Sequence, residues 1–201
     1  MTAAVRSLFA LALLGALAGC GQTPGQPLAP AAQAMTAEAS AKSLGAKAKA
    51  LFKDVFALYD TNKDDKWTPD DFDLPEDRFL NLFGKTDSND DHVVTWEEYY
   101  SDERHEELVL HSESRARVAA AGVGGHVNLE KVYFMMDGYL RQYLNKRERR
   151  KHLKEAFATC DANDDKRLNL GELAHLHALM DAKSDELYIQ KRVNRSKGQK
   201  G

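Results

Sequence analysis

Three acidic stretches of equal length decide the fold of this chain: DTNKDDKWTPDD (Asp60–Asp71), DSNDDHVVTWEE (Asp87–Glu98) and DANDDKRLNLGE (Asp161–Glu172). Each begins with Asp-x-Asn-x-Asp and ends on a carboxylate at its twelfth position. Because similarity within one chain marks a repeated structural unit, we expect three copies of one loop. The alternative is three unrelated acidic turns that cap helices, since Asp and Asn are common in turns.

Apolar residues flank the three stretches at fixed offsets. The eighth position is apolar in every copy: Trp67, Val94 and Leu168. An aromatic residue lies four positions before each stretch: Phe56, Phe83 and Phe157. The residue that follows each stretch is also apolar or aromatic: Phe72, Tyr99 and Leu173. Because solvated acidic turns have no need of such regular neighbours, the flanks favour one repeated unit over separate turns.

Helical periodicity surrounds the acidic stretches. Apolar residues recur at three- and four-residue spacing between Leu44 and Tyr59, which predicts one face of an amphipathic helix. Thr36 is a suitable N-cap for it, and Glu38 favours the helix dipole in the first turn. No stretch alternates apolar and polar residues long enough to demand a sheet. The sequence therefore predicts an all-α fold with only very short strands.

Repeats, flanks and helical surroundings together resemble the EF-hand superfamily of calmodulin-like, calcium-binding helix–loop–helix units. The resemblance implies a calcium ion in each loop, since calcium takes six to eight oxygen ligands. It implies side-chain ligands at loop positions one, three, five and twelve, a ninth position that often acts through a water, a backbone carbonyl at position seven, and a short β contact between paired loops. The implied ligands are Asp60, Asn62, Asp64, Lys66 (carbonyl), Thr68 and Asp71; Asp87, Asn89, Asp91, Val93 (carbonyl), Thr95 and Glu98; and Asp161, Asn163, Asp165, Arg167 (carbonyl), Asn169 and Glu172.

A fourth, degenerate hand is expected because EF-hands normally pair and three is an odd number. Val127-Asn128 aligns with Leu168-Asn169, which defines a loop over 120–131 with Gly125 at its sixth position. The positions that would carry side-chain ligands hold Ala120, Gly122, Gly124 and Lys131. This hand would keep the fold and lack the ion. The alternative is an ordinary glycine-rich connection between two helices.

Four residues depart from the family pattern. The sixth position, where glycine is usual because φ is positive, holds Asp65, His92 and Lys166. Asp71 closes the first loop in place of Glu, and its shorter side chain should reach less easily for a two-oxygen grip. We therefore expect weak calcium sites, with Mg²⁺ also accepted by the 60–71 loop.

The N-terminus is expected to be a targeting segment. Residues 1–19 contain an apolar run from Leu8 to Ala18 that is too short to span a bilayer and fits a secretory signal. Leu17-Ala18-Gly19-Cys20 resembles the bacterial lipobox, which implies that Cys20 is acylated and starts the mature chain. The alternative is an ordinary secretory signal with a coincidental cysteine.

A lipidated Cys20 would anchor the protein to a membrane of the bacterial cell envelope, the outer membrane if the source is Gram-negative. Residues 20–34 are rich in Pro and Gly and carry no charge, which is typical of a flexible tether. The rest is expected to divide into a first pair of hands over 35–110, a second pair over 111–188 and a basic flexible tail over 189–201.

Charge is unevenly distributed along a chain of net charge −3. That balance argues against a nucleic-acid binder that acts through bulk positive charge. Basic residues gather in RQYLNKRERRKHLK (141–154) and in the tail. These segments are expected to be either solvated faces or a contact for an anionic surface or protein partner.

No enzyme is predicted, because no nucleophile–base or nucleotide-binding motif is present. His105 and His111 are six residues apart and do not share a helix face, so they do not form a zinc-protease helix. His175 and His177 are expected on the surface. Cys160 is expected to be a buried thiol, with redox sensing as the alternative.

Calcium binding on a membrane-anchored protein is therefore the expected function. Two roles remain open. Calcium either stabilises the fold or a surface interaction, which weak sites favour, or it acts on a sensor that exposes a partner-binding surface.

Overall fold

The computed structural model describes residues 30–121 and 125–198, with side chains from Lys42 onward. Its elements, in chain order, are α1 (Pro30–Tyr59), β1 (Lys66–Trp67), the 3-10 turn η1 (Asp70–Phe72), α2 (Glu76–Phe83), β2 (Val94–Thr95), α3 (Trp96–Tyr99), α4 (Asp102–Ala121), α5 (Leu129–Met136), α6 (Lys146–Cys160) and α7 (Leu170–Gly198). The described chain is mostly helical, and its strands are two residues long. Both features agree with the predicted all-α class.

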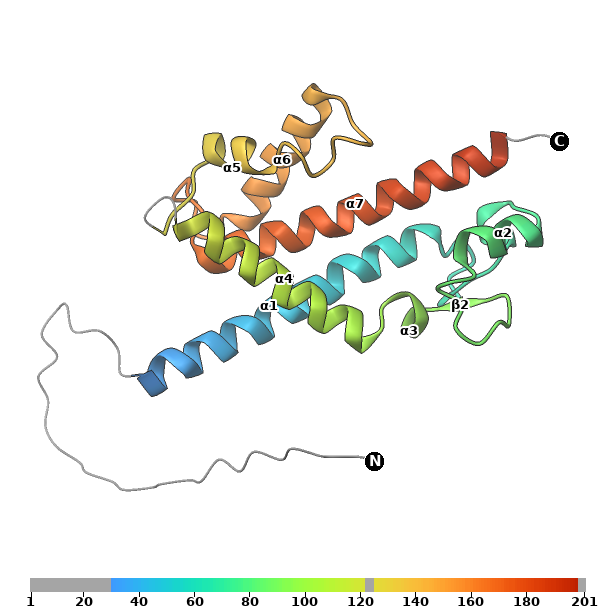
Figure 1. Cartoon of the computed structure of the whole chain (residues 1–201), viewed down its shortest axis with the longest axis horizontal. Helices are drawn as coiled ribbons and strands as arrows, with labels where there is room; N and C mark the ends of the chain where they lie inside the picture. The colour runs from blue at the N-terminus through green and yellow to red at the C-terminus, as the bar shows by residue number, and fades with distance from the viewer. Residues whose placement is uncertain (1–29, 122–124, 199–201) are drawn as a thin grey trace, which may run out of the picture.

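Three long helices, α1, α4 and α7, pack against one another and form the centre of the molecule (Figure 1). The short elements gather at its two ends: α5 and α6 at one, and α2 with the β1–β2 ribbon at the other (Figure 1). Each acidic loop connects elements at one of these ends, so the long helices fix the relative positions of the loops.

Two hydrophobic cores lie along the long helices. The core beside the first two loops is mainly aromatic: Phe52, Phe56, Trp67, Phe72, Phe79, Phe83, Tyr99 and Tyr100, with Val55, Leu74, Val94, Ala182, Ile189 and Val193. The core beside the other two loops is mainly aliphatic, with members such as Leu140, Leu153, Leu168 and Leu176. Helices α1 and α7 contribute to both cores. The expected boundary between 110 and 111 falls inside the continuous helix α4, so the two halves share their main helices.

The C-terminal segment corrects the sequence prediction of a flexible tail over 189–201. Helix α7 continues to Gly198. Ile189 and Val193 are buried on it, and their burial gives this end of the helix a reason to stay folded. The tail prediction overlooked the four-residue spacing of these two apolar residues, which places them on one helix face.

The N-terminal predictions fall largely outside the described residues. Helix α1 begins at Pro30, so residues 30–34 are helical rather than part of an extended tether. The signal segment 1–19, Cys20 and residues 21–29 lie outside the part that the structure describes. Within 30–121 and 125–198, no helix is both long and apolar enough to cross a bilayer.

Candidate metal-binding loops

The first aspartate of each acidic loop holds the loop closed through two backbone amides. In the 87–98 loop the Asp87 carboxylate accepts hydrogen bonds from the N–H groups of Asp91 (3.3 Å) and His92 (2.9 Å). The other two loops repeat these bonds at 3.0–3.2 Å: Asp60 with Asp64 and Asp65, and Asp161 with Asp165 and Lys166. Asp87 is only 3% exposed, and these amides partly replace the water it loses on burial.

The carboxylate at the twelfth position bridges the two sides of each loop. Glu98 accepts from the Ser88 N–H at 3.0 Å through one oxygen and from the Thr95 N–H at 2.9 Å through the other. The same pairs form in the other loops: Asp71 with Thr61 and Thr68, and Glu172 with Ala162 and Asn169. The last residue thus joins the second position of the loop to the ninth.

Asp71 reaches both backbone partners even though its side chain is one methylene shorter than Glu. It lies in the 3-10 turn η1, whereas Glu98 lies in α3. The hydroxyls of Thr61 and Thr68 also donate to it, each at 2.8 Å. The expected shortfall in reach is therefore absent from these contacts, because the local backbone compensates for the shorter side chain.

Hydrogen bonding keeps both terminal carboxyls ionised. Partial burial acts to raise the pKa of Glu98, but the donors of Thr95 and Ser88 outweigh it and hold the pKa below its ordinary value. For Asp71, burial is likewise opposed by donors from Thr61 and Thr68, and its pKa is lowered. Two negatively charged groups are thus available to a cation in the first two loops.

The third and fifth positions complete the repeated network. Asn89 accepts from the Asp91 N–H at 3.0 Å, and Asp91 accepts from the Val93 N–H at 2.9 Å. Equivalent bonds link Asn62, Asp64 and Lys66 in the first loop and Asn163, Asp165 and Arg167 in the last. Each loop therefore turns its polar side chains onto its own backbone in the same order.

Two residues in each loop adopt left-handed backbone. The sixth-position residues Asp65, His92 and Lys166 have φ of 61°, 65° and 62°, as expected for a site where glycine is usual. The fourth-position residues do the same: Lys63, Asp90 and Asp164. Positive φ at the fourth position was not expected from the sequence, although Asp at two of its three copies is a signal, since Asp tolerates this region better than most residues.

Two of the ninth-position side chains, Thr95 and Asn169, act as helix caps. The hydroxyl of Thr95 accepts from the Glu98 N–H, and the Glu98 carboxylate accepts from the Thr95 N–H, which together form a capping box for α3. The Asn169 side chain accepts from the Glu172 N–H at 3.1 Å. These residues, expected to act on an ion through water, thus also start the helix that leaves the loop.

The loops meet in pairs at their eighth positions. Strands β1 and β2 are antiparallel, with Trp67 opposite Val94. Val127 and Leu168 form an isolated antiparallel bridge, with backbone N–O distances of 3.0 and 2.8 Å in the two directions. All four side chains are fully buried. The predicted short β contacts between loops are confirmed at both ends.

The described part of the 120–131 segment shares the sixth-position turn, the β bridge and the helix cap, and the sequence of this segment has no carboxylate at the first, third, fifth or twelfth position. Gly125, at its sixth position, has φ of 90°. Asn128, at the ninth, caps α5 by accepting from the Lys131 N–H at 3.0 Å. Gly122 and Gly124 lie outside the described residues. The segment thus resembles the acidic loops in its turn, bridge and cap.

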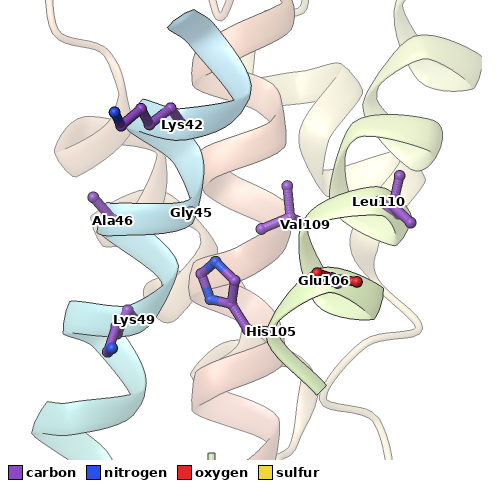
Figure 2. A pocket seen from close by; sticks show the side chains of 8 residues that line it. All are labelled: Lys42, Gly45, Ala46, Lys49, His105, Glu106, Val109 and Leu110. Atoms are coloured by element: carbon purple, nitrogen blue, oxygen red, sulfur yellow. The ribbon is translucent and has the colours of Figure 1, made fainter. Parts of the chain in front are cut away.

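Cys160 directly precedes the 161–172 loop, whereas His105 and His177 lie on the helices α4 and α7. Cys160 is buried, as predicted, and burial raises the pKa of its thiol to about 12. His177 is buried rather than on the surface as predicted, with Nδ1 2.9 Å from the Tyr139 hydroxyl. His105 lines an apolar groove of about 480 Å³ between α1 and α4, beside Gly45 and Val109 (Figure 2).

A metal ion needs several ligating side chains gathered around one point. Across residues 30–121 and 125–198, no group of three or more His, Cys, Asp or Glu side chains is gathered so that it could hold a metal. The carboxylate oxygens accept from loop amides instead. The donor set of each loop, carboxylate and amide oxygens with backbone carbonyls between them, has the hard-oxygen chemistry that calcium and magnesium prefer. The chain matches no protein-family model, and no curated protein matches it.

Proposed function

We propose that this protein binds calcium through the loops 60–71, 87–98 and 161–172, as a membrane-anchored protein of EF-hand type whose fourth hand, 120–131, carries no ion. The observation that supports this most directly is the network that recurs in all three acidic loops. Each has a first aspartate on two amides, a terminal carboxylate on two others, and left-handed residues at its fourth and sixth positions. Three unrelated turns would have no reason to share it.

Calcium in these loops would supply positive charge where the chain concentrates negative charge. The 87–98 loop holds five acids and neither Lys nor Arg, while the 161–172 loop balances four acids against Lys166 and Arg167. Coulomb attraction therefore favours the 87–98 loop as the tightest site.

A stabilising role is proposed in preference to a sensor. Helices α1 and α7 pass through both cores, and opening either half would disturb the other. Neutralising the acids of a closed loop needs no such opening. Binding of an apolar dye separates the two roles. A stabilising ion raises the melting temperature without new dye binding, and a sensor increases dye binding when calcium is added.

Isothermal calorimetry with calcium and magnesium on the chain from Gly21 onward tests the proposal. The matched variants are Glu98→Gln and Glu97→Gln, since both remove one negative charge and only Glu98 bridges the loop. Glu98→Gln should abolish binding in the 87–98 loop, and Glu97→Gln should weaken it only modestly. Absence of heat and of any change in tryptophan emission up to several millimolar calcium would contradict the proposal.

The membrane anchor has its own test. Cys20→Ser should move the protein from the membrane fraction to the soluble fraction of cells that express it. Retention of the serine variant in membranes, with the signal segment uncleaved, would show that residues 1–19 anchor the chain themselves. In that case the lipid would have to be dropped from the proposal.

A further inference from the structure

Phe134 is the most exposed large apolar side chain among the described residues, at 81% exposure. It lies on α5, between Val132 and Met136, which are both buried in the aliphatic core. The packed side of α5 thus faces the core, and Phe134 projects from the other side. A lone exposed aromatic is ordinary, so its surroundings decide whether it has a use.

Basic residues surround it. Phe134 lines a hollow of about 740 Å³ together with Tyr133, Arg141, Lys146 and Arg150. The Arg150 guanidinium lies 5.4 Å from the centre of the Tyr133 ring, which holds both side chains at the rim. Within the described residues, neither Lys146 nor Arg150 forms an ion pair with a carboxylate. We call these five residues the aromatic–basic face.

The carboxylates next to this face do not cancel its charge. Asp137 is already engaged by Arg149 at 3.0 Å and by Arg141 at 3.1 Å. Glu130 is the remaining acid that lines the hollow. Lys146 and Arg150 therefore leave an excess of positive charge around two aromatic rings, which is complementary to a surface that is anionic outside and apolar beneath.

The face also lies toward the end of the molecule where the chain enters. Along the long axis of the molecule, α5 and the first turn of α1 lie toward one end, and the β1–β2 ribbon lies toward the other (Figure 1). A tether that precedes α1 would hold this end near the membrane. The ion-binding loops of the first pair would then point away from the bilayer.

We propose that the aromatic–basic face docks on a bilayer that contains anionic phospholipid, with Phe134 inserted at the interface and Lys146 and Arg150 among the headgroup phosphates. Each basic group near such a surface gains about a five-fold increase in partitioning, and an inserted aromatic ring adds to it. The two aromatic residues of the face lie on α5, which leaves the 120–131 segment, and Lys146 and Arg150 lie in the first half of α6, far from the end that enters the 161–172 loop. None of the five residues is a proposed ion ligand, so we expect docking without calcium.

The test uses the full chain with Cys20→Ser, in EDTA, and vesicles that contain brominated lipid. Phe134→Trp places a reporter on the face, while the unsubstituted chain gives the signal of Trp67 and Trp96. On vesicles with about a third anionic phospholipid, the added tryptophan should be quenched, and salt should reverse the quenching. On purely zwitterionic vesicles the added quenching should be lost. Because EDTA removes calcium from this assay, its outcome is independent of the outcome of the calorimetry.

Matched variants of the reporter chain assign the effect to the face. Lys146→Gln with Arg150→Gln should weaken partitioning into anionic vesicles about 30-fold. Lys49→Gln with Lys85→Gln makes the same change of charge elsewhere and should have little effect. No added quenching on anionic vesicles, equal quenching on zwitterionic ones, or equal effects of the two double variants would each overturn the proposal.

Discussion

The two pairs of loops use the same backbone contact with different chemistry. In the first pair both loops carry the acidic network, and the contact extends over two residues on each strand. In the second pair one loop is acidic, the other has no acid at the ligand positions, and the contact shrinks to the Val127–Leu168 bridge. The comparison teaches that loop pairing depends on buried apolar residues at the eighth positions. The acidic side chains of the ligand positions are not needed for the two loops to pair.

The hydrophobic cores beside the two pairs of loops also differ, since the first is mainly aromatic and the second is mainly aliphatic. Trp67 stacks on Phe56 with ring centres 4.7 Å apart, and its Nε1 donates to the Phe56 carbonyl at 2.9 Å. Leu168 meets aliphatic neighbours instead. A large aromatic that is packed and hydrogen-bonded concentrates stability at one residue, whereas aliphatic side chains share it. The predictions below test this contrast, from the largest effect to the smallest.

Removing the indole should damage the first pair most. Trp67→Ala should lower the free energy of unfolding by about 3–5 kcal/mol, because it opens a large cavity and removes one of the two hydrogen bonds to the Phe56 carbonyl, the other being from the Asp60 N–H. Chemical denaturation measures the loss. Trp96→Ala is the control, since Trp96 is only half buried. If both variants lost equal stability, the aromatic core would not be concentrated at Trp67.

Acid should weaken the second half through His177. Burial, helped by nearby Arg115, lowers the pKa of His177 to about 4, below its ordinary 6.5. The unfolded chain then binds more protons between pH 6.5 and 4, so stability falls as the pH drops through that window, by about 3 kcal/mol. Denaturation at several pH values should show that His177→Gln removes this dependence. The exposed His126, changed to Gln, should leave it intact; if His177→Gln also leaves it intact, another group is responsible.

The turn of the degenerate hand should depend on its glycine. Gly125→Ala should cost about 1–2 kcal/mol, because Gly125 has φ of 90° and a side chain there is strained although no atom blocks it. Thermal unfolding measures the effect. Gly138→Ala is the control, since no atom lies near its Cβ position and its φ is not positive. Equal stability of the two variants would mean that 120–131 tolerates another turn.

Introducing a glycine at the sixth position of the last acidic loop should raise the stability of the protein. Lys166→Gly should raise stability by less than about 1 kcal/mol, because it relieves left-handed strain while the unfolded chain gains freedom. The same denaturation assay measures this gain, and calcium affinity should rise with it. Lys154→Gly, inside α6, should instead destabilise the protein. A loss of stability in Lys166→Gly would show that the lysine side chain contributes more than its backbone costs.

Sequence alone determined the local features whose causes lie within a dozen residues. The loop boundaries, the apolar eighth positions, the positive φ at the sixth positions and the helical class all follow from side-chain types at fixed spacing. The aligned segment 120–131 was found in the same way, because Gly125, Val127 and Asn128 keep the positions that set turn, bridge and cap.

Tertiary structure decided what depends on residues distant in the chain. Nothing local shows that α7 runs on to Gly198, because Ile189 and Val193 are held by the aromatic core of the first pair. Nor does local sequence show that His177 is buried, since Tyr139 and Arg115, both distant in the chain, lie near it. The two halves share helices for the same reason: burial is set by all elements packed together, whereas turns and caps are set by hydrogen bonds between near neighbours.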